Sequence, residues 1–260
     1  MKRLLSILLL GILLLVTQRS FALDNDPKKN RQLWLWFQFT KQLPKKFSIG
    51  FQYQVRFDHN MRTFSGENFY AVLGYRINKY ISTQFTYQFF TSPKVDNHTF
   101  FLSLTGKYRV GPVSFGLRTA YQHVNEYFAR RYESGHEPID EWRNRFTIKY
   151  DFARNWDIYA YCEPYLLFSA KPNAQGIYLE KMRNLIGVDW SFYKYNTIAL
   201  FYFFQPEFTG KRPEYQHVIG MVYDFNLPKK VNWKKFFHPK KKKKGGEEKL
   251  DSDEKDRLYD

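Results

Sequence analysis

The sequence predicts an all-β protein: an antiparallel up-and-down transmembrane β-barrel of about 10–12 strands. Three observations lead there: strict alternation of apolar and polar residues, predicted strands that mostly run 11–14 residues, and connections that alternate between tight turns and longer polar loops. A strand sends successive side chains to opposite faces, so this alternation makes one face apolar and the other polar. No segment of the body shows convincing helical spacing.

Composition excludes several other classes of protein. The 260 residues carry a net charge of +16 and are 20% aromatic and 25% charged. A polytopic helical membrane protein would need several uncharged apolar stretches of about 20 residues, and a disordered chain would hold far fewer aromatics. The single cysteine, Cys162, excludes a disulfide scaffold and a cysteine-based zinc ribbon.

The N-terminus predicts export. Lys2 and Arg3 precede an apolar run from Leu4 to Val16, and Ser20-Phe21-Ala22 supplies a small-x-small cleavage site. We therefore expect residues 1–22 to be a cleaved signal peptide, residues 23–30 a linker and residues 31–228 an outer-membrane barrel. The apolar run is short for a membrane anchor. Export also makes nucleic acid a poor partner, despite the basic composition.

Alternation defines eleven candidate strands. They span about 31–41, 46–58, 67–78, 80–91, 98–109, 112–124, 141–152, 155–168, 179–191, 196–207 and 214–225. Strands of soluble proteins usually have about 5–6 residues, whereas a tilted transmembrane strand needs about 9–11. Bacterial single-chain barrels have an even number of strands. We therefore expect twelve, with one strand missed, or ten, with residues 31–41 outside the barrel.

The connections support the membrane barrel. Tight links such as Asn78-Lys79 and Arg154-Asn155 follow the odd strands, and longer polar links such as 59–66 and 125–140 follow the even ones. Short periplasmic turns alternate with longer external loops in outer-membrane barrels. With this assignment the first strand runs from the outside towards the periplasm.

The two strand faces differ in chemistry. One face is rich in Phe and Tyr, with Trp142 and Tyr108 near strand ends as in an interfacial girdle. The other face is charged, and charges need water or partners, which a barrel lumen supplies. The inverse arrangement, with the apolar face inside, would give a soluble periplasmic barrel that binds a lipid or another apolar ligand. That arrangement is the main structural alternative.

The charged face has two interpretations. Its candidate lumen residues are Arg56, Arg76, Arg109, Arg118, Arg143, Arg145, Glu163, Arg183 and Asp189. They could line an anion-attracting pore, or they could pair with one another and fill the lumen. Barrels of about 8 strands are filled by side chains and open channels appear at about 16, which favours the filled lumen. Glu163 stands out because it lies in mid-strand beside Pro164, which suggests a bulge.

A third hypothesis is an outer-membrane enzyme that modifies lipid. Membrane acyl hydrolases would need a His and a Ser two residues apart on one strand, and no His-x-Ser occurs. Asp58-His59 is an isolated Asp–His pair, and the sequence has neither a cluster of metal-ligand spacing nor a Gly-x-Ser-x-Gly motif. We therefore expect no catalytic residue, metal or cofactor, and favour a structural or interaction protein or a narrow pore.

The C-terminal residues 229–260 form a separate unit. Residues 229–244 hold nine lysines and no acid, whereas residues 245–260 hold three basic and seven acidic residues. Trp233, Lys234, Lys235, Phe236 and Phe237 interleave aromatics with lysines, a pattern that suits contact with an anionic membrane surface. The alternative is a solvated, disordered periplasmic tail whose halves attract each other.

Several local motifs resemble one family of exported proteins. They are Trp34 and Trp36, Gln54-Val55-Arg56, Gly74-Tyr75-Arg76, Arg143-Asn144-Arg145, Glu163-Pro164, Arg183-Asn184 with Gly187, and His217, Gly220 and Tyr223. The chain resembles, over residues 31–225, the family named domain of unknown function 2490 (DUF2490), thought to be outer-membrane β-barrels of Gram-negative bacteria. The resemblance implies the barrel fold and brings no activity. One departure is that 35 residues follow Phe225, the aromatic residue expected to close the last strand.

Overall fold

The computed structural model describes residues 29–93, 96–125, 139–169, 176–193, 195–208 and 214–229. The signal peptide, most of the linker and the aromatic–lysine tail segment lie outside these residues. Within them, no helix is long and apolar enough to cross a membrane. The chain forms eleven strands and one short 3-10 turn, η1 (Pro44–Lys46). The strands are β1 (Lys29–Gln42), β2 (Phe47–Asp58), β3 (Thr63–Arg76), β4 (Ile81–Thr91), β5 (Asp96–Val110), β6 (Val113–Asn125), β7 (Ile139–Ala153), β8 (Trp156–Ser169), β9 (Gly176–Tyr193), β10 (Asn196–Glu207) and β11 (Glu214–Leu227).

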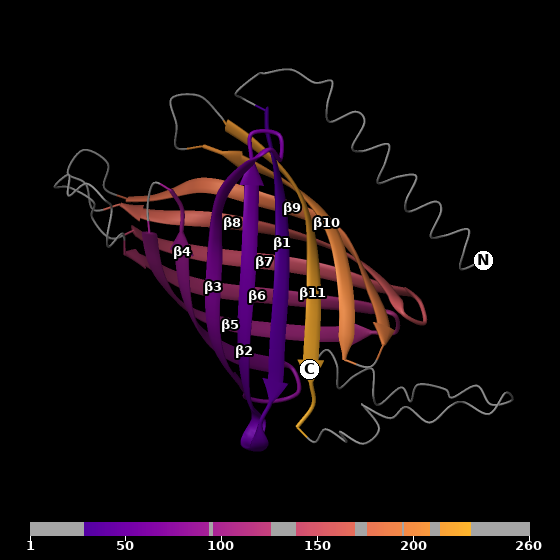
Figure 1. Cartoon of the computed structure of the whole chain (residues 1–260). Coiled ribbons are helices and arrows are strands. Elements are labelled where there is room, and N and C mark those ends of the chain that lie inside the picture. Colours follow the sequence, from indigo (N-terminus) through magenta and orange to yellow (C-terminus); the bar gives the residue numbers. More distant parts are fainter. Residues whose placement is uncertain are drawn as a thin grey trace, which may run out of the picture.

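The strands close into one barrel in sequence order. Successive strands pair antiparallel, and the barrel is closed by β1 and β11, which pair in parallel from Lys29↔Tyr215 to Lys41↔Leu227 (Figure 1). The predicted barrel of about 10–12 strands is confirmed, and the eleven candidate strands are all present, but the expectation of an even number, ten or twelve, was wrong. The residues 29–42 form a full wall strand, and eleven strands close because the first and last run in the same direction. Odd-stranded membrane barrels are known outside bacteria.

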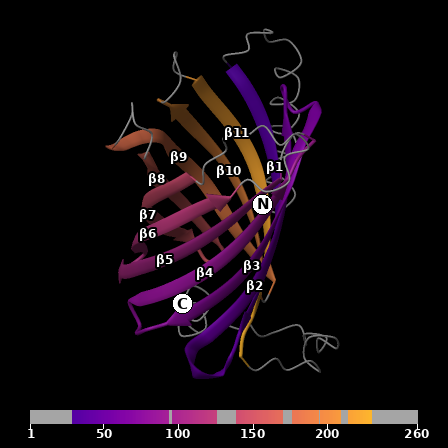
Figure 2. The same cartoon turned by 90° about the vertical axis from the view of Figure 1, so that its left-hand side faces the viewer.

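The two ends of the barrel differ in their connections. At the turn end, adjacent strands are joined by tight links such as residues 111–112, where Gly111 adopts a φ of 57°. The links at the opposite end, the loop end, are longer, and the longest of them spans residues 126–138. The predicted loop at 59–66 was too long, because β3 already begins at Thr63. Since β1 runs parallel to β11, it starts at the loop end and finishes at the turn end (Figure 2).

The outer surface is apolar and the lumen is polar. Large side chains that alternate along the strands face outward, among them Phe51 (43% exposed), Leu102 (59%) and Phe146 (55%). Gln54 and Asn68, on the opposite face, are fully buried. The alternative of a soluble barrel with an apolar interior is therefore wrong for this fold. An apolar exterior around a closed sheet satisfies the requirement that no backbone group meets lipid unpaired.

Candidate functional site: the charged lumen

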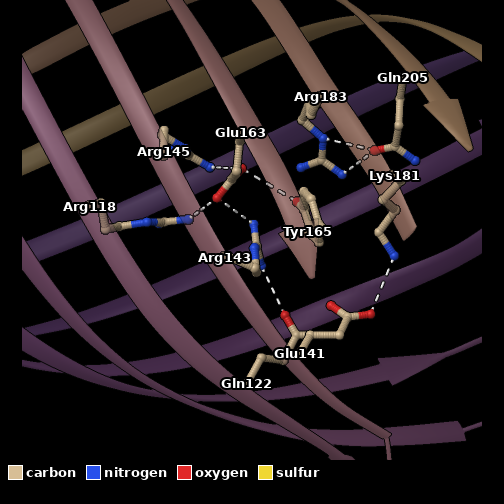
Figure 3. Close-up of polar contacts among 10 residues, drawn as sticks. All are labelled: Arg118, Gln122, Glu141, Arg143, Arg145, Glu163, Tyr165, Lys181, Arg183 and Gln205. Atoms are coloured by element: carbon tan, nitrogen blue, oxygen red, sulfur yellow. Dashed lines mark hydrogen bonds and ion pairs between the residues drawn. The ribbon is translucent and has the colours of Figure 1, made fainter. Parts of the chain in front are cut away.

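The centre of the lumen holds one carboxylate bound by three arginines. Glu163 lies on the inward face of β8 and is completely buried. Its Oε1 accepts hydrogen bonds from Arg118 of β6 (2.6 Å) and Arg143 of β7 (3.1 Å), and its Oε2 accepts one from Arg145 of β7 (2.9 Å) (Figure 3). Three cations against one carboxylate leave this group, the Glu163 cluster, with an excess of positive charge.

Aromatic rings support the arginines of the Glu163 cluster. The Arg143 guanidinium carbon lies 4.4 Å from the centre of the Tyr165 ring, and that of Arg145 lies 4.2 Å from the Tyr161 ring. Alternation along β8 places both tyrosines on the same inward face as Glu163. A guanidinium over an aromatic face is attracted by the ring quadrupole. The rings thus fix the arginines without neutralising their charge.

Further cations lie beside the Glu163 cluster. Arg183 of β9 stands opposite Glu163 in the strand register but donates to Gln205 of β10, at 3.1 and 2.9 Å. Arg56 of β2 stacks over Trp34, with 4.1 Å between its guanidinium carbon and the ring centre. Lys181 contacts Glu141 at 3.5 Å. These side chains come from distant strands and meet because their faces converge in the lumen.

A cavity of about 730 Å³ opens between these side chains. Its charged lining consists of six basic residues, Arg56, Arg118, Arg143, Arg145, Lys181 and Arg183, and two acidic residues, Glu141 and Glu180. Its lining also includes the aromatic residues Trp34, Trp36 and Phe203. We call this space the upper cavity, because its lining extends to the loop end of the barrel.

A second cavity of about 240 Å³ lies nearer the turn end and is acidic. Its charged lining is Asp189 and Asp224. The Lys149 ammonium lies 2.7 Å from Asp189 and 3.2 Å from the buried Asp157, so one cation serves two carboxylates. We call this space the lower cavity. The charge of the lumen therefore changes sign along its length.

The structure separates the nine predicted lumen residues into groups. Arg118, Arg143, Arg145 and Glu163 form one cluster, and Arg56 and Arg183 share the upper cavity with it. Asp189 belongs to the lower cavity. Arg109 pairs with Asp151 at 2.5 Å at the turn end, far along the strands from Glu163, and Arg76 is the last residue of β3 at that same end.

Sequence reasoning missed a row of alternating aromatic residues and glycines on the inner wall. Neighbouring strands place Tyr159, Gly187, Phe201, Gly220 and Trp34 side by side across β8, β9, β10, β11 and β1. A Cβ added at Gly187 or Gly220 would collide with the ring of Tyr159 or Phe201. The row could have been predicted from the glycines on the inward face of long, aromatic-rich strands, because aromatic rings commonly cover glycines on sheets.

It also missed a polar group on the outer surface at the loop end. Asp140 of β7 accepts a hydrogen bond from Tyr121 (2.7 Å) and contacts His123 Nδ1 (2.6 Å), both from β6. Asp58 and His59, the pair visible in the sequence, are also 2.6 Å apart. Among the described residues, no group of three or more His, Cys, Asp or Glu is arranged to hold a metal ion.

Comparison with known proteins shows the family of the chain. The model of the family described as "Protein of unknown function (DUF2490)" matches residues 31–216. The chain belongs to the DUF2490 family. No curated relative matches it. Similar solved structures include the NanC porin (10% identity, TM-score 0.47, covering 73% of this chain and 91% of that one), the KdgM porin (10%, 0.43, 72% and 88%) and the outer-membrane protein OmpT of Vibrio cholerae (14%, 0.36, 62% and 54%). This DUF2490 protein is an all-β closed barrel with an apolar exterior.

Proposed function

We propose that this DUF2490 protein is a narrow outer-membrane pore that admits small anions. One observation carries the proposal: the upper cavity is lined by six basic residues and two acidic ones, and counting Glu163, which binds three of the arginines, still leaves six basic residues against three acidic ones. A cleft that carries one sign of charge between low-dielectric walls focuses the field and concentrates ions of the opposite sign. The proposal therefore gives the lumen arginines a role in attracting solute as well as in stabilising the barrel.

Unfilled hydrogen-bond donors support an anionic occupant. In the lining of the upper cavity, Trp36 Nε1 and the Nε atoms of Arg118, Arg143 and Arg145 are buried without an acceptor among the described residues, while Asn97 Oδ1 and Glu141 Oε2 are buried without a donor. Buried donors need a partner, from water or from a ligand. Guanidinium groups suit carboxylate and phosphate oxygens, and cavities of about 300–1,000 Å³ are the usual size of small-molecule sites.

A second candidate is a structural barrel filled by its own side chains. The observation that favours it is the Glu163 cluster, which links the neighbouring strands β6, β7 and β8 on the inner face of the wall. Barrels of about 8 strands are filled and those of about 16 conduct, and eleven strands lie between. A filled barrel would hold the same charges without passing ions, so a flux measurement separates the two functions.

The test is chloride entry into proteoliposomes. Purified protein is reconstituted in vesicles that contain a chloride-quenched dye, with valinomycin present so that potassium balances the charge. We expect quenching by added chloride that exceeds that of vesicles with heat-denatured protein. Quenching equal to the denatured control, with the barrel shown to be folded by its gel mobility before and after boiling, would favour the filled barrel.

Location and partners complete the proposal. The apolar exterior supports contact with outer-membrane lipids, and a predicted signal peptide of residues 1–22 would deliver the chain there. The Lys-rich segment around Trp233, Lys234, Lys235, Phe236 and Phe237 would then lie at the periplasmic surface, near anionic lipid. Cell fractionation checks the location: the protein should resist carbonate extraction and sediment with outer-membrane markers.

A further inference from the structure

The upper and lower cavities meet at two side chains. Tyr159 of β8 and Val222 of β11 are the residues common to the linings of both cavities. We infer that Tyr159, held against Gly187, sets the width of the passage between the two cavities. The inference rests on the proposed pore and identifies the residue that limits the size of its solute.

Gly187 is required for the position of the Tyr159 ring. The two residues are direct partners in the β8–β9 register, and both face inward. A Cβ placed on Gly187 would lie 2.5 Å from Tyr159 Cζ and 2.6 Å from its hydroxyl oxygen. Real Cβ atoms do not approach other atoms so closely, so any larger residue at position 187 must displace the ring. Because Tyr159 lines both cavities, we expect a methyl group at position 187 to push its ring towards the lumen.

The same wall contains a matched aromatic–glycine pair next to Gly187, whose ring lines the upper cavity alone. Phe201 covers Gly220 in the β10–β11 register, and a Cβ on Gly220 would collide with the Phe201 ring. Phe201 lines the upper cavity and is absent from the lining of the lower one. A methyl group at Gly220 therefore produces the same local clash as one at Gly187 but should leave the junction of the cavities unchanged.

The junction is also where the lumen charge reverses. Above Tyr159 lie the Glu163 cluster and Arg183. Beside and below it lie three carboxylates, Asp157, Asp189 and Asp224, and the cation Lys149, which pairs with the first two. An anion that leaves the upper cavity must pass Tyr159 and then meet a field of unfavourable sign. A narrow passage at this point therefore makes the largest contribution to resistance, because size and charge oppose the anion together.

The experiment compares single-channel conductance in planar bilayers for the wild type and four variants. Tyr159→Ala should raise the conductance by about twofold or more, because it joins the two cavities, and Tyr159→Phe, which keeps the ring, should not change it. Gly187→Ala should lower it by about twofold, and Gly220→Ala should have a smaller effect. Gel mobility before and after boiling shows that each variant is folded.

The double variant Tyr159→Ala/Gly187→Ala should recover at least the wild-type conductance, because the methyl group then has no ring to displace. Equal effects of Gly187→Ala and Gly220→Ala, or no change in Tyr159→Ala, would overturn the inference while leaving the pore itself established. If Gly187→Ala does not fold, the comparison of the conductance of Tyr159→Ala with that of Tyr159→Phe still tests whether the Tyr159 ring limits the passage. A wild type that is closed to ions and a Tyr159→Ala variant that conducts would contradict the proposed pore but support Tyr159 as the barrier.

Discussion

The buried carboxylate of Glu163 allows the sharpest test of the lumen electrostatics. Glu163 has no exposed side-chain surface, and the side chains of its three arginine partners are 12–27% exposed. The substitution Glu163→Gln keeps the size of the side chain and one acceptor oxygen but removes the negative charge. Arg118, Arg143 and Arg145 would then face one another without a counter-charge.

The expected cost follows from the burial of the group. Removing one partner of a buried ion pair typically destabilises a protein by about 3–5 kcal/mol, because the remaining charge stays buried without compensation. The partial exposure of the arginines gives water access to them, so we expect the lower value, about 3 kcal/mol. In a domain of about 200 residues, 1 kcal/mol shifts Tm by about 2–4 °C, which predicts a loss of about 6–12 °C.

The assay is thermal unfolding of the purified barrel in detergent, followed by far-ultraviolet circular dichroism. The matched control is Glu67→Gln, because Glu67 lies on the outer surface, where it accepts a hydrogen bond of 2.6 Å from Tyr53. Adding Arg118→Gln to Glu163→Gln should restore part of the lost stability, since it removes one of three like charges. A Tm for Glu163→Gln no lower than that of Glu67→Gln would refute the reasoning.

Three further predictions use the same unfolding assay. Trp34→Ala should lower the free energy of unfolding by about 3–5 kcal/mol, because Trp34 is only 4% exposed and packs edge-on against Phe203. A loss below about 1 kcal/mol would contradict this, because it would show that water fills the vacated site at little cost. Lys149→Met should destabilise the barrel at neutral pH and less at acid pH, because Asp157 and Asp189 lose their shared cation and protonation relieves their repulsion; a loss independent of pH would contradict this. Asp140→Asn should change stability by less than about 1 kcal/mol, because this surface group is 38% exposed; a larger loss would indicate a structural role for its contacts at the loop end.

Alternation allowed the two faces of the barrel to be predicted, because a period of two leaves no freedom in which side chains share a face. The register between strands could not be read in this way. Glu163 was identified as an inward carboxylate near arginines, but its shortest contact is with Arg118, which lies two strands away in β6. That partnership depends on barrel curvature and on stagger, which no local pattern encodes. The bulge suggested by Pro164 is found at the next pair, between Tyr165 and Leu166.

The eleven candidate strands match the structure, but the expectation of an even strand number failed for a related reason. The alternation in residues 29–42 predicts a strand but does not say which strands it pairs with. Its parallel pairing with β11 arises only when the barrel closes. The start of β3 was placed too late because Gly66 interrupts the alternation near a register shift between Arg56 and Phe57. The pairing of His123 with Asp140 was missed because the two residues lie on either side of a long loop. Contacts between strands are thus the information that a single sequence lacks.

The most direct test of an anion-admitting lumen is the zero-current potential of the wild-type protein in a planar bilayer under a gradient of KCl. Six basic residues against two acidic ones in the upper cavity predict a potential displaced towards the equilibrium potential of chloride. A potential displaced towards that of potassium would show that the acidic lower cavity controls permeation. Such a result, or a folded protein that carries no current, would contradict the proposed function.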